Sequence, residues 1–104
     1  MRWLETVLVQ VGGDEEKNAE NQVRELACKL LTKPGCSGLV TARVYRHALI
    51  TGAFALQLLW DTDKLQPYGS HIGLGFKETM EKRGIVDHKI WIEMKGEKYA
   101  RHAI

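Results

Sequence analysis

The stretch Leu39–Asp61, L-V-T-A-R-V-Y-R-H-A-L-I-T-G-A-F-A-L-Q-L-L-W-D, is the part of the sequence that says most about the fold. Residues 39–47 and 53–61 both alternate with a period of two, as expected of β-strands that bury one face. The residues between them include Thr51-Gly52, and so short a connection favours an antiparallel hairpin. We therefore expect two neighbouring strands in the middle of the chain.

The two faces of this hairpin differ in composition. One face is apolar and consists of Val40, Ala42, Val44, Phe54, Leu56, Leu58 and Trp60. The other face is mixed and consists of Thr41, Arg43, Tyr45, His47, Ala55, Gln57 and Leu59. The apolar face predicts a core that other elements cover.

The residues before the hairpin predict a strand and a helix. Residues 3–11, W-L-E-T-V-L-V-Q-V, are rich in β-branched side chains and too few for a typical helix. Three carboxylates at 14–16 suit a helix N-terminus, and Pro34-Gly35 ends the helix. Its apolar face consists of Ala19, Val23, Leu26, Ala27, Leu30 and Leu31. Cys28 falls on this side, which predicts a buried thiol, and a disulfide to Cys36 in the following turn is disfavoured.

The residues after the hairpin predict a second helix and a fourth strand. Residues 61–69 have the composition of a loop, and Ser70 is a good N-cap. The apolar face of the second helix consists of Ile72, Phe76, Thr79 and Met80, and Gly84 ends this helix. In the strand 86–94, one face consists of Val86, His88, Ile90, Ile92 and Met94. The tail 95–104 has no clear pattern.

The order β-α-β-β-α-β is that of the ferredoxin-like α+β fold, a four-stranded antiparallel sheet with both helices on one face. We expect one domain over residues 1–104, with its core in 3–94. The open face of the sheet would carry Thr41, Arg43, Tyr45, Gln57, Leu59, Lys89 and Trp91, with Glu5 and Val7 or their neighbours from the first strand. This is too much apolar surface to leave in water, so we predict a homodimer that packs sheet against sheet.

Composition excludes several classes of protein. The 104 residues contain 15 Lys and Arg against 13 Asp and Glu, and the net charge of +2 is too small for a nucleic-acid-binding surface. No run of apolar residues is long enough for a secretion signal or a membrane span. With no secretion signal, no membrane span and two cysteines that form neither a CxxC motif nor a metal-ligand pair, the sequence predicts a soluble cytoplasmic protein.

The histidines and glycines match few known motifs. The four histidines are His47, His71, His88 and His102. Their spacing is not that of a metal site, so we predict no metal, and His88 fits a hydrogen-bonded core or pocket position. The segment 69–76, G-S-H-I-G-L-G-F, lets the helix approach the sheet closely, or it leaves room for a ligand that faces Ser70 and exposed amides.

Trp60 ends the third strand, just before the loop that leads to His71. Core packing is the commonest role of tryptophan. A second hypothesis is an aromatic pocket that Trp60 forms with Tyr68, His71, Phe76 and His88. Such a pocket, with few polar groups, suits a flat phenolic or quinone-like small molecule.

The predicted third strand ends in L-L-W-D, a polar loop precedes His71, and the closing stretch is Gly84–Trp91, G-I-V-D-H-K-I-W. These features resemble the dimeric α/β-barrel superfamily, and within it the antibiotic biosynthesis monooxygenase-like group. The resemblance implies oxygenation by O2 with no metal, flavin or other cofactor, because the deprotonated substrate itself supplies the electrons. It also implies that Trp60 and His71 are catalytic, although their separation of eleven positions slightly exceeds the usual spacing. The first strand has no asparagine and the second helix has no tryptophan, which disfavours haem degradation.

Three functions remain open at this point. The first is a cofactor-independent monooxygenase of an aromatic, phenolic or quinone-like molecule, with Trp60 and His71 as catalytic residues. The second is a non-catalytic homodimer that binds a small molecule or serves as a regulatory module, and the third is a structural or assembly role. The residues expected to contact a ligand are Arg43, Tyr45, Tyr68, Ser70, Phe76 and His88.

Overall fold

The computed structural model describes residues 1–32 and 37–94. Its elements are β1 (Arg2–Val11), the short 3-10 helix η1 (Gly13–Glu15), α1 (Glu16–Thr32), β2 (Leu39–Arg46), β3 (Ala53–Asp61), α2 (His71–Glu81) and β4 (Gly84–Ile92). The expectations for the Leu31 side chain, Pro34-Gly35, Cys36, His102 and the tail 95–104 fall outside what the structure describes.

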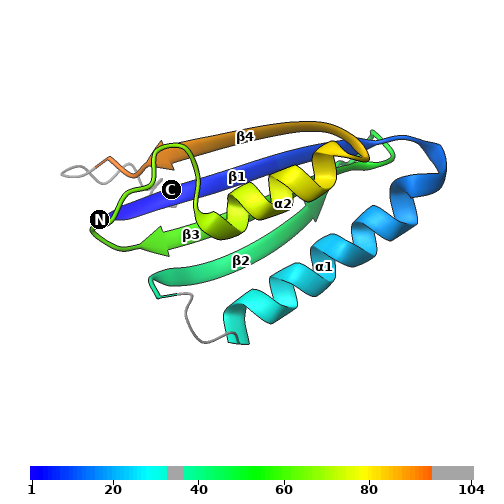
Figure 1. The fold of residues 1–104 in the computed structure, drawn as a ribbon. Helices are drawn as coiled ribbons and strands as arrows, with labels where there is room; N and C mark the ends of the chain where they lie inside the picture. The colour runs from blue at the N-terminus through cyan, green and yellow to red at the C-terminus, as the bar shows by residue number, and fades with distance from the viewer. Residues whose placement is uncertain (33–36, 95–104) are drawn as a thin grey trace, which may run out of the picture.

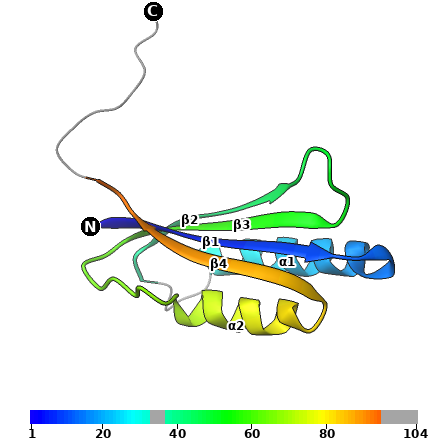
Figure 2. The ribbon, with the colours of Figure 1, turned by 90° about the horizontal axis from the view of Figure 1, so that it is seen from above.

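The four strands form one antiparallel sheet in the order β2-β3-β1-β4. Both helices lie on the same side of the sheet, with α1 packed against β2 and α2 packed against β4 and β1 (Figure 1). Figure 2 shows the two layers from the side, with the helices below the sheet and the other face of the sheet open. This arrangement confirms the predicted ferredoxin-like α+β fold.

β1 buries residues that the sequence pattern does not assign to one face. Trp3, Glu5 and Val7 point toward the helices and are at most 1% exposed. Glu5 and Val7 therefore do not belong to the open face, which instead receives their neighbours, including Thr6 and Leu8. The reason is that apolar residues occupy both odd and even positions of this strand, so alternation alone does not identify the buried side.

A β-bulge changes the alternation in β2. The register shifts between Leu39 and Thr41, so that Leu39 pairs with Trp60 and packs against the core. Val40 is the extra residue and is 41% exposed, which corrects its predicted place on the apolar face.

The hydrophobic core lies between the sheet and the helices. It consists of Trp3, Val7, Val9, Val11, Ala19, Val23, Leu30, Phe54, Leu56, Leu58, Trp60, Phe76 and Met80. The four β3 residues in this set confirm the buried face predicted from their alternation. Burial of apolar surface stabilises a fold by roughly 25 cal/mol per Å², so this layer holds both helices on the sheet.

Two predicted core positions on the helices are exposed. Cys28 in α1 lies two positions from buried Leu30, which turns it about 200° away around the helix. Thr79 in α2 is also exposed, and its hydroxyl donates to the carbonyl of Gly75 one turn earlier at 3.0 Å. Both predictions of burial are therefore wrong.

β4 begins two residues earlier than the sequence predicts. Gly84 is its first residue and does not cap α2, which ends at Glu81. A Cβ at Gly84 would collide with the carbonyl oxygen of Gln10, so a glycine allows the two strands to pair closely here. At the other end the strand stops at Ile92, and Met94 lies beyond it with its side chain exposed.

Candidate functional site

Glu5 is the one fully buried charged side chain among residues 1–32 and 37–94, at 0% exposure. β1 places it on the helix-covered face of the sheet, between Trp3 and Val7. A buried carboxylate is costly unless hydrogen bonds replace its lost water, so its partners define a polar site inside the core.

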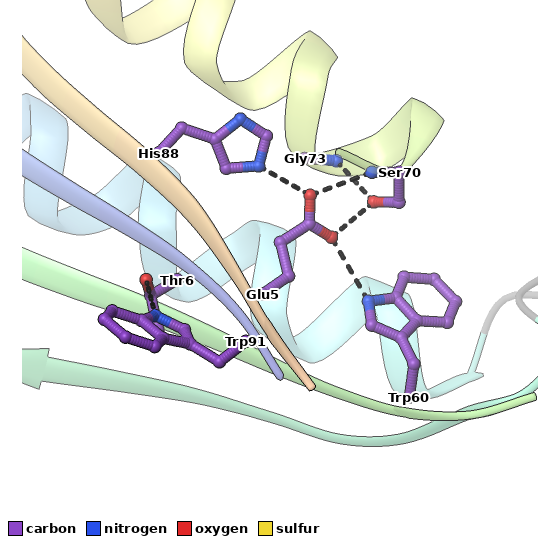
Figure 3. Close-up of polar contacts among 7 residues, drawn as sticks. All are labelled: Glu5, Thr6, Trp60, Ser70, Gly73, His88 and Trp91. Carbon is purple, nitrogen blue, oxygen red and sulfur yellow. Dashed lines mark hydrogen bonds and ion pairs between the residues drawn. The ribbon is translucent and has the colours of Figure 1, made fainter. Parts of the chain in front are cut away.

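Each oxygen of Glu5 accepts two hydrogen bonds (Figure 3). Oε1 accepts from the Trp60 indole at 3.1 Å and from the Ser70 hydroxyl at 2.6 Å. Oε2 accepts from the Ser70 backbone N–H at 2.9 Å and lies 2.7 Å from Nε2 of His88. Trp60 and Ser70 supply three donors to the two oxygens, and a proton on Nε2 of His88 would supply the fourth.

The sheet register explains why Trp60 and His88 reach the same carboxylate. Directly opposite Glu5 lie the apolar residues Leu58 on β3 and Ile90 on β4. Trp60 and His88 are the diagonal neighbours, two positions away on each strand and on the same face. Long side chains at diagonal positions can meet over the central residue, and these two do so from opposite sides.

The N-terminus of α2 closes the site from above the sheet. Ser70 caps the helix, and its hydroxyl accepts a hydrogen bond from the Gly73 N–H at 2.9 Å while donating to Glu5. The carboxylate thus lies at the positive end of the helix dipole. A Cβ at Gly73 would collide with Oε2 of Glu5, which supports the close-packing interpretation of this glycine.

The structure brings together only some of the predicted catalytic and ligand-binding residues. Trp60, Ser70 and His88 converge on Glu5, and the Trp60 ring stacks on Trp3 with centroids 5.4 Å apart and planes at 15°. Phe76 is buried in the core, as a packing residue would be.

The other predicted site residues lie apart from this cluster. Tyr68 is 87% exposed, and His71 is exposed at the first turn of α2. Arg43 and Tyr45 lie on β2 and point to the open face of the sheet. Tyr68 therefore takes no part in the cluster around Glu5. Of the two predicted catalytic residues, His71 is exposed to solvent and Trp60 is buried.

Glu5 is the functional candidate that sequence reasoning missed. The available signal was a single acidic residue inside an otherwise apolar strand, W-L-E-T-V-L-V. It shares the alternation of Trp3 and Val7, two residues away on either side, but alternation does not identify the buried side of a strand with apolar residues on both faces.

The part of the chain that the structure describes contains neither a metal-binding group of side chains nor a helix that could span a membrane. Within 1–32 and 37–94, no three His, Cys, Asp or Glu side chains are grouped so that they could hold a metal ion. No helix in the same residues has both the length and the apolar composition needed to cross a membrane.

No family model and no curated protein sequence matches the chain. Solved structures do resemble it. SnoaB, a cofactor-independent oxygenase from Streptomyces nogalater, is 13% identical with a TM-score of 0.65, over 91% of this chain and 95% of its own. A protein from Caulobacter crescentus, provisionally described as an antibiotic biosynthesis monooxygenase, is 14% identical with a TM-score of 0.67, over 90% and 91% of the two chains. A similarly described protein from Nitrosomonas europaea is 14% identical with a TM-score of 0.64, over 86% and 88%.

At identities this low, the structural similarity concerns the fold alone. The neighbours confirm, at that level, the resemblance to antibiotic biosynthesis monooxygenase-like proteins that the sequence suggested. The residues of the site must therefore support any function on their own chemistry.

Proposed function

We propose that this protein, which shares its fold with antibiotic biosynthesis monooxygenase-like structures, is a cofactor-independent monooxygenase of an aromatic, phenolic or quinone-like small molecule. The observation that supports this most is the buried carboxylate that Trp60 and His88 share with Ser70, the residue directly before the exposed His71. The cluster fixes the N-terminus of α2 on the sheet, and with it the exposed histidine that would accept the substrate's proton.

The proposed reaction converts an activated CH2 group beside an aromatic ring into a carbonyl. A base removes a proton, and the resulting carbanion, delocalised into the ring, reduces O2. One oxygen atom enters the product as C=O and the other leaves as water, so that R2CH2 and O2 give R2CO and H2O. No further oxidant or reductant is required, and the protein has to bind the substrate, accept its proton and stabilise the anion.

His71 is the proposed base in this scheme. Its ring is exposed, so a substrate can reach it from solvent, and it follows Ser70 at the N-terminus of α2. The helix dipole there favours the negative charge that develops on the substrate. Trp60 is buried in the core and is held in one orientation by its bond to Glu5 and its stacking on Trp3, so it would position the N-terminus of α2 through Glu5 and would not contact the substrate.

A homodimer is part of the proposal. The open face carries Leu4, Leu59 and Trp91 side by side, and these line a shallow depression at one end of the sheet. Trp91 is 55% exposed, and its indole donates to the Thr6 hydroxyl at 3.2 Å. A second copy packed on this end would remove the exposed indole from water, and stable interfaces of this kind bury roughly 800 Å² per partner.

The test is oxygen uptake with anthrone as the substrate, followed by mass spectrometry of the product formed under 18O2. We expect uptake above the spontaneous oxidation rate and one labelled oxygen atom in the product. His71→Ala should lower the rate by about 100-fold or more, because a lost general base typically costs that much. Glu78→Ala, an exposed change on the same helix, is the matched control and should retain the rate.

The alternative is a non-catalytic homodimer that binds a small molecule. It is favoured by one specific observation, namely that all four hydrogen bonds of Glu5 are made within the protein, as in a purely structural network. Under this alternative anthrone causes no oxygen uptake, while native mass spectrometry of freshly purified protein finds a dimer with a retained small molecule. An unchanged rate in His71→Ala would remove His71 from the catalytic role.

A further inference from the structure

We propose that the connection between β2 and β3, residues 47–52, is an arm that grips a second copy of this chain, with Leu49 seated against the partner's Ile85, and that protonation of His47 releases it. The arm rests on the homodimer of the proposed function. It adds to that dimer a second contact and a means of regulation, and it does not depend on the oxygenase chemistry.

The arm carries an apolar tip on the open side of the sheet. Figure 2 shows it rising from the sheet on the side away from the helices, toward the space that a second copy on this face would occupy. Leu49 is 89% exposed, the highest value for a large aliphatic side chain in residues 1–32 and 37–94, and Ile50 beside it is exposed as well. We call these two residues the tip. Neighbouring apolar side chains held out in water are typical of an interaction surface.

Hydrogen bonds hold the arm in one shape. At its base the His47 N–H donates to the carbonyl of Ala53 at 2.8 Å, and the Val11 N–H donates to the carbonyl of Gly52 at 2.9 Å. Gly52 has a φ of +83°, and a Cβ there would collide with the Val11 carbonyl oxygen, so a glycine is required at this position. A surface that is ordered before it binds loses little conformational entropy on binding.

The side chain of His47 fixes the tip itself. Its Nδ1 accepts from the backbone N–H of Leu49 at 3.0 Å and of Ile50 at 2.9 Å. A ring nitrogen that accepts carries no proton, so the neutral imidazole has its proton on Nε2. Protonation of Nδ1 would set an N–H against these two donors, and the turn that presents Leu49 would open.

The same end of the open face has a depression that a side chain of the partner can enter. It measures about 320 Å³, and its walls include the exposed apolar side chains of Leu8, Ile50 and Ile85. The small residues Ala53 and Ala55 on β3 form its floor. Ile85 is 76% exposed at the start of β4. The tip and the depression are thus complementary, since both are apolar and both are uncovered in a single chain.

A two-fold axis parallel to the strands brings the tip to this depression. Because the sheet order is β2-β3-β1-β4, such an axis lays the β2–β3 half of one copy over the β1–β4 half of its partner. The arm and Ile85 lie at the same end of the sheet, since Gln10 pairs with both Ala53 and Ile85. Leu49 of each copy therefore meets the partner's Ile85, and the contact occurs twice.

The charges of the open face favour this axis over one that runs across the strands. Arg43 on β2 and Lys89 on β4 lie in the same row of the sheet, and Asp87 is 3.3 Å from the Lys89 ammonium. An axis across the strands would place β2 on β2, so that Arg43 meets the partner's Arg43. The parallel axis instead places Arg43 near the partner's Asp87, and it lays the Trp91 end of one copy on the same end of the other.

The arm makes the dimer sensitive to pH. The charged groups that face His47 are its neighbour Arg46, Glu16 on α1 and Asp87 on β4, which line the same pockets as its ring. Of these residue types, histidine is the one that ordinarily changes charge between about pH 7.5 and about pH 5.5. We therefore expect a tight dimer at the higher pH, where Nδ1 accepts, and a weaker dimer at the lower pH, where it is protonated.

Sedimentation equilibrium of the full-length protein measures the dissociation constant of the dimer. In the wild type it should rise about tenfold or more from about pH 7.5 to about pH 5.5. His47→Asn is the matched variant, because the asparagine oxygen can accept from the same two N–H groups and does not titrate. Its dissociation constant should change by no more than about twofold over this range. His71 and His88 are present in both proteins, so the difference isolates His47.

Two further variants separate the tip from the rest of the surface. Leu49→Ser should raise the dissociation constant about tenfold or more at about pH 7.5, because an apolar contact is lost from both copies. Leu74→Ser is the control, since Leu74 is 42% exposed on α2, away from the open face, and should change the dissociation constant by no more than about twofold. His47→Ala should give a weak dimer at both pH values, because no acceptor then holds the tip.

Cross-linking tests the pairing of the two copies directly. Protein with Leu49→Cys is mixed with protein that carries Ile85→Cys, both in a background of Cys28→Ser and Cys36→Ser, and the mixture is oxidised. Each chain then has one cysteine, so a disulfide between positions 49 and 85 must join two chains. Mass spectrometry of the unreduced peptides should find this link, and Leu74→Cys in place of Leu49→Cys should give none.

Three results would overturn the arm. They are a wild-type dimer without the link between positions 49 and 85, a His47→Asn variant that is as sensitive to pH as the wild type, and a wild-type protein that is monomeric at about pH 7.5. Anthrone oxidation by a dimer that lacks the link would remove the arm and keep the proposed oxygenase. A linked dimer without oxygen uptake would do the reverse, so the two failures are distinguishable.

Discussion

Replacing the Glu5 carboxylate with an amide tests how much the buried cluster contributes to stability. In Glu5→Gln one acceptor oxygen becomes an NH2 group that faces the donors now bonded to it, so at least one buried donor loses its partner. We expect the free energy of unfolding to fall by about 1–3 kcal/mol. Urea denaturation measures this loss, with the exposed Glu93→Gln as a control that should change little. Equal stability of Glu5→Gln and wild type would show that the hydrogen bonds of the cluster are dispensable.

At the scale of single elements, the two glycines of α2 provide an internally matched comparison. Alanine is favoured over glycine in helices by about 1 kcal/mol. Gly75→Ala should be stabilising by roughly this amount, because nothing lies within 4 Å of the added Cβ. Gly73→Ala should be destabilising despite the same propensity gain, because its Cβ collides with the Glu5 carboxylate. Thermal unfolding of both variants measures whether each substitution raises or lowers stability. A stabilised Gly73→Ala would mean that α2 can move off the sheet without cost.

The individual strands and helices show which structural features the sequence could predict and which it could not. The β3 face from Phe54 to Trp60 and the Ser70 cap were predictable, because alternation and capping depend on neighbours in the chain. The bulge at Val40 was not, since it arises from how β2 fits β3. Glu5 was missed for a related reason: its partners lie 55 to 83 positions away, and only the register brings them together.

For the whole molecule, the proposed dimer predicts the effect of a charge at the apolar end of the open face. Trp91→Glu would place carboxylates in the interface between two sheets, and we expect it to convert a dimer into a monomer. Light scattering coupled to size-exclusion chromatography measures the mass. Leu74→Glu is the control, because Leu74 is 42% exposed on α2, away from this face, and should leave the dimer intact. A wild-type monomer, or a Trp91→Glu variant that remains dimeric, would exclude an interface centred on Trp91.

The Glu5 cluster also has a consequence for the order in which the protein folds. Its hydrogen bonds join positions separated by 55, 65 and 83 residues, so the carboxylate links the first strand to the third strand, the second helix and the last strand. Contacts of such long range form only after the intervening chain has been gathered, at a cost in loop-closure entropy. Helix α1 and the β2–β3 hairpin can form earlier from local contacts. The hydrogen bonds of the Glu5 cluster would then form last, and the fluorescence of Trp60 would report this final step of folding.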